Sequence, residues 1–305
     1  MANSNQLIET IRDIVNFSFS WMKDKEMQKL YLGLLVAYFA LSLFTITKED
    51  PLAFLNFEAI GTFGIVALFV MIVAFIASLY FSFKVLFKTM NLKFSKLRSF
   101  NLESVVMLIV LQILTFFAGL FSVFELKWLA LLGAAILFGI AGAFSPMLIT
   151  AGSSSAFPVG LLGAVLLVLS AICAVAYFVI IMRNAVRLSP AAGLYLQGKG
   201  LTASLSESWK TTPGKALKIF AIFLVSGVIV MVLTGVELLI SAIFTLIEGE
   251  WVISEIGVRP FSAFLSALLS AFSAIFQTFT YVGMLVWLFG AKRGVKTKVA
   301  VKHKK

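Results

Sequence analysis

A polar stretch in the middle of the chain runs from Met182-Arg-Asn-Ala-Val-Arg-Leu-Ser-Pro190 through Gly198-Lys-Gly200 to Ser206-Glu-Ser-Trp-Lys-Thr-Thr-Pro-Gly-Lys215. Long apolar segments precede and follow it, so we expect a structured loop at one face of a membrane. Of the 305 residues, 61% are hydrophobic and 13% are charged. A soluble protein of this size needs far more polar surface, and the composition therefore predicts an all-α, polytopic helical membrane bundle.

The content of reactive residues excludes several classes of function. The chain has one cysteine, Cys173, and one histidine, His303. An intrachain disulfide and a Cys/His metal cluster are therefore excluded, and nucleophilic catalysis that needs an imidazole is hard to build. We expect no catalytic residue, no cofactor and no bound metal, and we interpret Cys173 as an inert apolar residue.

The N-terminal segment, residues 1–29, is mixed polar and charged, and no cleavable signal peptide is apparent in it. Residues 5–22 alternate at helical spacing, with Leu7, Ile11, Ile14 and Val15 on one side. This pattern predicts a helix that lies in the cytoplasmic interface of the membrane. An ordinary entry helix with no membrane role of its own is the alternative.

The predicted transmembrane domain covers residues 30–290 and contains seven apolar segments. They are residues 30–46, 60–83, 105–124, 128–150, 159–182, 214–247 and 260–290. The net charge of +11 is concentrated in three places: the segment 84–98, the central loop 183–216 and the tail 291–305. Acidic residues gather at 47–51 and 248–259. Basic residues that flank spans mark the cytoplasmic side, and this placement indicates topology rather than nucleic-acid binding.

The number of crossings follows from these charges. Seven crossings would put the central loop and the tail outside, whereas six put every basic segment inside, with both termini cytoplasmic. We therefore predict six crossings in the cell membrane. Segment 128–150 contains Gly133, Gly139, Gly142 and Pro146, which weaken a helix, so we predict that it is a re-entrant or outer-face segment. Seven crossings with an outside C-terminus remain the alternative.

The central loop has its own turn and cap signals. Pro190 is expected to end the preceding helix, and Gly198 and Gly200 permit a tight reversal. Thr202 or Ser204 can cap a short helix, and Ser204 with Glu207 three positions later fits a capping box.

That short helix is predicted to be amphipathic. Leu201, Leu205 and Trp209 fall on one face, and the tryptophan is typical of a membrane interface. Thr212 is then expected to cap the next helix, with Pro213 at its first position. The loop would thus lie on the cytoplasmic surface before the chain enters a new span.

One set of loop residues resembles a motif of a broad prokaryotic family of six-span membrane proteins. The set comprises Arg187, Pro190, Gly200, Ser208, Trp209, Thr212 and Gly214. The family includes the membrane domain of some glycerophosphodiester phosphodiesterases and stand-alone relatives of unknown role. The resemblance covers the loop closely and residues 105–290 loosely, and it implies a six-span fold. No phosphodiesterase catalytic domain follows, so that hydrolytic activity is not expected.

Three polar residues in the apolar segments are candidate intramembrane sites. Glu237 would lie about 36 Å along the helix from Pro213, at the outer interface, where it contacts water or a lysine or else serves in proton or cation transport. Gln112 and Gln277 are deeper. We expect these amides, together with the hydroxyls of the cluster Gln277-Thr-Phe-Thr-Tyr281, to form interhelical hydrogen bonds. A stripe of small residues, namely Ser262, Ser266, Ser270 and Ala274, predicts close helix packing within the monomer or a homodimer seam.

These observations support two hypotheses. The first is a non-enzymatic membrane or envelope protein that binds lipid or a protein partner. The basic loops and tail would attract anionic headgroups at about 1 kcal/mol per cation, whereas the tail has no aromatic residue to stack on nucleic-acid bases. The alternative is a small transporter or channel with Glu237 in its pathway. A lipid-modifying enzyme ranks third, because clustered acid and base groups at the interface are not found.

Overall fold

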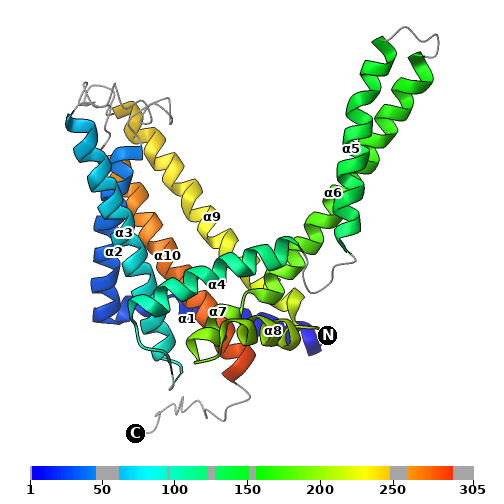
Figure 1. Ribbon diagram of the computed structural model, residues 1–305. Coiled ribbons are helices and arrows are strands. Elements are labelled where there is room, and N and C mark those ends of the chain that lie inside the picture. The colour runs from blue at the N-terminus through cyan, green and yellow to red at the C-terminus, as the bar shows by residue number, and fades with distance from the viewer. Residues whose placement is uncertain are drawn as a thin grey trace. The chain divides into compact units, whose positions relative to one another are not determined.

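The computed structural model describes residues 2–45, 62–94, 97–121, 128–150, 156–247 and 260–290. These residues are helical without any strand, which confirms the all-α prediction (Figure 1). The predicted acidic segments 47–51 and 248–259 and the basic tail 291–305 lie outside the described residues.

Within this part of the chain, five helical stretches are long and apolar enough to cross a membrane. They are Leu68–Asn91, Leu102–Leu120, Leu161–Leu196, Ala216–Ile240 and Phe261–Phe289. This finding confirms a membrane-embedded helical protein. The predicted first crossing, 30–46, lies in α2 (Lys25–Thr45) as far as the structure describes it. This helix starts with charged residues and is not among the five.

The chain divides into two compact units. The first unit comprises residues 1–100 and 218–305, and the second comprises residues 101–217. Both lie largely within the transmembrane domain predicted for residues 30–290. The two boundaries follow the polar, basic segments of the chain, one after residues 84–98 and the other after the central loop 183–216.

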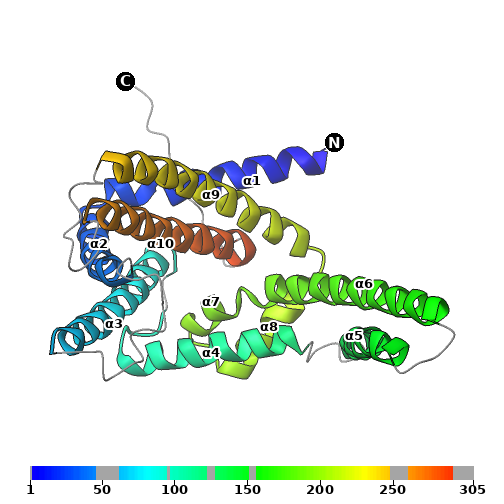
Figure 2. The same ribbon diagram turned by 90° about the horizontal axis from the view of Figure 1, so that it is seen from above.

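The first unit is organised around α10 (Pro260–Phe289), which packs against the N-terminal helices and α3. Its other elements are α1 (Ala2–Ser18), η1 (Ser20–Lys23), α2, α3 (Thr62–Asn91) and nearly all of α9 (Ala216–Ile247). Figure 2 shows α9 beside α10. The core contains Trp21, Met27, Leu34, Ile275 and Phe279, each at most 5% exposed.

The close packing of α10 uses a different stripe from the predicted one. Ala263, Ala267 and Ala271 are fully buried, whereas Ser270 is exposed. Ser262, Ser266 and Ala274 are half-buried. The alanine stripe lies one position further along the chain and has the same four-residue spacing. It therefore packs α10 within the monomer, where small side chains allow helices to approach closely.

The N-terminal helix α1 packs its predicted apolar face against α10. Ile14 is buried, and a Cβ atom at Gly283 of α10 would lie 3.2 Å from Ile14 Cγ2 and 3.3 Å from Phe17 Cδ1. Buried hydroxyls reinforce the contact, since Ser18 Oγ lies 2.9 Å from Thr280 Oγ1. Ser226 of α9 donates to the same threonine oxygen over 3.5 Å. These three hydroxyls tie α1, α9 and α10 together.

The second unit contains an antiparallel hairpin of α5 (Leu129–Thr150) and α6 (Ala156–Leu188) (Figure 1). Ser170 Oγ donates to the Ala135 carbonyl over 2.7 Å. A Cβ atom at Gly142 would lie 2.8 Å from Leu167 Cγ, so this glycine permits the close approach.

Segment 128–150, predicted as re-entrant or outer-face, is a continuous helix in which Pro146 does not interrupt the backbone. Its glycines at 139 and 142 face α6 rather than break the helix, because their missing side chains leave room for Ser170 and Leu167. The irregular backbone expected from glycine and proline is therefore absent from the described part of this segment.

The helix α4 (Leu102–Leu120) meets the other end of the hairpin. The Tyr177 hydroxyl of α6 donates to the Leu120 carbonyl, and Asn184 Nδ2 donates to the Gly119 carbonyl over 3.5 Å. The helix also packs against α7 and α8, the two short helices that follow α6. Figure 1 shows α4 lying crosswise to the hairpin, beside α7 and α8.

Candidate functional site

The central loop folds into two short helices. After α6 ends at Leu188, α7 covers Ala191–Leu196 and α8 covers Leu201–Thr211. Pro190 is the N-terminal cap residue of α7, which confirms that it ends the preceding helix. Leu188, Leu194 and Leu196 are at most 1% exposed, so the loop has an apolar core of its own.

Four of the predicted motif residues form one cluster. The Arg187 guanidinium lies 3.5 Å from the centroid of the Trp209 ring, and its Nη2 donates to the Trp209 carbonyl over 3.0 Å. Ser208 Oγ and Thr212 Oγ1 donate to the Arg187 carbonyl over 2.8 Å and 3.2 Å. The side chain and the backbone of Arg187 therefore both hold α8.

This arrangement follows from the needs of a helix end. The last four carbonyls of an α-helix lack partners within the helix, and the Arg187 carbonyl belongs to this group in α6. Two hydroxyls from α8 satisfy it, while the stacked guanidinium adds a cation–π contact. The helix α8, which begins 13 residues after the end of α6, is thus fixed to that end.

The predicted caps of the loop are wrong. The N-terminal cap residue of α8 is Gly200, and Ser204 Oγ donates back to the Gly200 carbonyl over 2.8 Å. Glu207, the expected partner in the capping box, forms an ion pair with Lys199 instead. Thr212 is the C-terminal cap residue of α8 and does not cap α9, which starts at Ala216.

The glycines of the loop differ in what they require. Gly198 and Gly214 have φ angles of +92° and +75°, in the left-handed region that favours glycine. Gly200 has a φ angle of −68°, and a Cβ atom there would meet no atom within 4 Å. The reversal predicted for Gly198 and Gly200 therefore depends on Gly198.

The face of α8 that is buried in the protein is lined by hydroxyls. Ser204 and Ser208 are fully buried, whereas Leu201, Leu205 and Trp209 are half-buried. The predicted apolar face is thus only partly covered by the protein. This exposure suits a helix at a membrane surface, where the apolar side chains meet lipid.

Four basic residues lie near the cluster in the sequence. Arg183 and Lys210 are exposed, and Lys199 and Lys215 are half-buried. Glu207 is the one acidic residue between Arg183 and Lys215, and it already pairs with Lys199. The loop therefore presents a net positive surface beside the end of α6.

The three intramembrane candidates lie on three different helices, α4, α9 and α10. Glu237 is half-buried on α9, about 32 Å along the helix from Ala216. Gln112 and Gln277 are exposed, so the interhelical hydrogen bonds predicted for them are not observed. Thr280, in the same cluster 277–281, does form an interhelical hydrogen bond of the kind expected there, with Ser18. The partner Ser18 could not be predicted from the sequence, because residues 5–22 have the pattern of a helix at the membrane surface.

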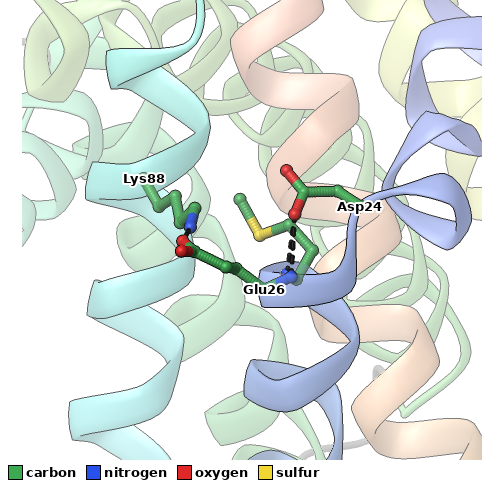
Figure 3. Close-up of polar contacts among 4 residues, drawn as sticks. Asp24, Glu26 and Lys88 are labelled. Carbon is green, nitrogen blue, oxygen red and sulfur yellow. Dashed lines mark hydrogen bonds and ion pairs between the residues drawn. The ribbon is translucent and has the colours of Figure 1, made fainter.

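A second set of polar contacts lies in the first unit (Figure 3). Asp24 precedes α2, and its Oδ1 accepts hydrogen bonds from the backbone N–H groups of Glu26 and Met27 over 2.9 Å and 3.3 Å. The Glu26 carboxylate forms an ion pair with Lys88 of α3. These contacts cap one helix and join it to the next.

Within the described residues, no group of three or more His, Cys, Asp or Glu side chains could hold a metal ion. Comparisons with protein families, with curated proteins and with solved structures find no match to this chain.

Proposed function

We propose that this protein is a non-enzymatic, multi-pass protein of the cell membrane that binds anionic lipid headgroups at its central loop. The observation that carries the proposal is the fixation of α8 through the Arg187 carbonyl and guanidinium. A connection that served only to join α6 to α9 would need no such attachment. The attachment supports a defined surface from which Arg183 and Lys210 project.

We further propose six crossings, with both termini and the central loop in the cytoplasm. Support comes from the concentration of lysine and arginine in 84–98, 183–216 and 291–305. A reporter fused after Lys305 should be found on the cytoplasmic side. An external reporter would contradict this topology without bearing on lipid binding at the loop.

A relationship to the six-span family that includes the phosphodiesterase membrane domain is part of the same proposal. The support is that Arg187, Ser208, Trp209 and Thr212 contact one another. Matching residues that contact one another support a relationship more strongly than matching residues that are far apart. Gly214, with its positive φ angle, has a physical reason to belong to the motif.

Native mass spectrometry of the full chain in detergent tests the lipid proposal. Phosphatidylglycerol should bind in preference to phosphatidylcholine, and the double variant Arg183→Gln/Lys210→Gln should weaken that binding about 30-fold, at about 1 kcal/mol per cation. Ala203→Gln, which changes an exposed residue of α8 without changing charge, is the matched control.

Equal affinity for the two lipids would overturn the proposal. A stoichiometric protein that co-purifies with the native chain and is lost from the double variant would instead assign the loop to a protein partner. Both measurements use the intact chain, so neither depends on isolating the loop.

A further inference from the structure

The C-terminal end of α4 lies beside the C-terminal end of α6. Tyr177 donates to the Leu120 carbonyl, and a Cβ atom at Gly119 would lie 3.8 Å from the Ala185 backbone nitrogen. The basic loop begins at Arg183, only about 9 Å along the helix from Tyr177. The end of α4 is therefore at the level of the basic loop.

The N-terminal end of α4 follows a second basic segment. Lys93 and Arg98 precede Leu102 by at most nine residues, and the whole segment 84–98 carries no acidic residue. Segments rich in lysine and arginine next to spans stay on the cytoplasmic side. The contacts of α4 with α7 and α8 agree, because these helices belong to the basic loop. Both ends of α4 are thus assigned to one side of the membrane.

The hairpin partner α5 is not among the five stretches named above, but its pairing with α6 and its full length suit a crossing helix. It runs antiparallel to α6. Ala135 contacts Ser170, whereas Gly142, further along α5, lies against Leu167, which comes earlier in α6. Its 22 residues correspond to about 33 Å, enough to span the hydrocarbon core. Residues 129–182 contain no charged side chain. If α6 crosses, the helix paired along it crosses as well.

The exposed surface of α4 indicates whether the helix contacts water or lipid. Ser104, Leu108 and Leu111 lie on a buried face, and no charged residue occurs from 104 to 121. The exposed large apolar side chains are Leu102, Val106, Ile109, Val110, Ile113, Leu114, Phe116, Phe117 and Phe121. Contact of this surface with water would be unfavourable, at about 25 cal/mol for each Å² of apolar area. Acyl chains are the partner that such a charge-free surface fits.

We propose that α4 does not cross the bilayer but lies in its plane, where its exposed apolar face binds acyl chains of the cytoplasmic leaflet. The six crossings are then α2, α3, α5, α6, α9 and α10. The inference rests on the six-crossing topology proposed above, and it replaces segment 128–150 by α4 as the apolar segment that stays on one side.

Depth measurements along α4 test this placement. In a Cys173→Ala background, single variants Val106→Cys, Ile113→Cys and Phe116→Cys would carry a bimane fluorophore in vesicles of phosphatidylcholine brominated at known acyl carbons. All three side chains are at least 47% exposed, so labelling leaves the packing intact. An in-plane helix gives depths within about 5 Å of one another, whereas a crossing helix separates positions 106 and 116 by about 15 Å.

A second measurement uses sealed vesicles of known orientation and a membrane-impermeant maleimide. Leu102→Cys, Phe121→Cys and Lys210→Cys should react from the same side, and Ala156→Cys from the opposite side. Reaction of positions 102 and 121 from opposite sides, or depths that change steadily along α4, would overturn the proposal. Absence of quenching at all three positions, with cross-linking between copies, would assign the apolar face to a second copy and reject lipid as its partner.

The outcomes separate this inference from the proposed function. An external reporter at Lys305 would reject six crossings, but the depth profile would still decide how α4 lies. Loss of preference for phosphatidylglycerol at Arg183 and Lys210 would leave the profile of α4 unchanged.

Discussion

The two units of the chain hold their helices together in different ways. In the most apolar part of α10, 56% of the residues are buried, against 11% in the most apolar part of Leu161–Leu196, a stretch that covers most of α6. The first unit is stabilised by side-chain packing, including the rings of Phe17 and Phe279, whose centroids are 5.2 Å apart. In the second unit α6 relies on one contact line with α5 and on polar contacts at its end. Side-chain packing therefore covers most of α10, whereas most of the surface of α6 is left exposed.

The largest expected effect comes from matched truncations of two phenylalanines. Phe279 is 1% exposed and Phe178 on α6 is 59% exposed. Phe279→Ala should lower the free energy of unfolding by about 3–5 kcal/mol, because it leaves a cavity in the core. Phe178→Ala should change it by about 0.5 kcal/mol or less, as expected for a surface position. Denaturation by SDS in mixed micelles measures both, and equal losses would contradict the comparison.

A smaller effect is expected from two glycines of the central loop. Gly214→Ala should cost about 1–2 kcal/mol, since an L-residue is strained at its φ angle of +75°. Gly200→Ala is the control, because its φ angle of −68° suits alanine and its surroundings are open. Thermal unfolding followed by circular dichroism compares the two. A loss at Gly200 as large as that at Gly214 would exclude backbone strain as the cause.

The caps of the two units offer the next test. Asp24 caps α2 through its side chain, whereas α8 starts at Gly200 without a side-chain cap. Asp24→Ala should destabilise the first unit by about 1 kcal/mol, and Asp24→Asn should retain most of the stability because asparagine also caps helices. The midpoint of chemical unfolding gives both values. If asparagine were as destabilising as alanine, the carboxylate charge rather than the cap would be responsible.

The smallest effect is expected for the ion pair of Glu26 with Lys88. The Glu26 side chain is 71% exposed, so water and salt screen the pair. Glu26→Gln should lower the stability by about 0.5 kcal/mol or less. Repeating the unfolding measurement at high salt provides the control, since the native chain and the variant should then converge. A loss that persists at high salt would point to packing of the side chain instead.

The long helices could be predicted from the sequence because apolar length is a property of composition. Segment 214–247 became α9 from Ala216 to Ile247, and segment 260–290 became α10 from Pro260 to Phe289. The loop motif was also recognisable, and four of its residues do meet. The predicted helix caps were wrong, because contacts with residues distant in the sequence replaced the local hydrogen bonds. Thr212 fits a cap for α9 in the sequence, but its hydroxyl binds the Arg187 carbonyl, 25 residues away.

The pairing of helices could not be predicted for a similar reason. The glycines of segment 128–150 weaken an isolated helix, yet at Gly142 the absent side chain is what admits Leu167. Glycine therefore destabilises an isolated helix but permits close packing when the helix has a neighbour. Periodicity identified neither the alanine stripe of α10 as the packed one nor Ser18 as the partner of Thr280, because both depend on which helices become neighbours.

The length of α6 has a mechanical consequence. Its 33 residues extend for about 50 Å, while the hydrocarbon core of a bilayer is about 30 Å thick. As a crossing helix it must tilt, or extend beyond the hydrocarbon core at one end. A thicker membrane reduces the tilt. Arg187 couples α8 to the last turn of α6. The orientation of α8 therefore depends on the thickness of the surrounding bilayer.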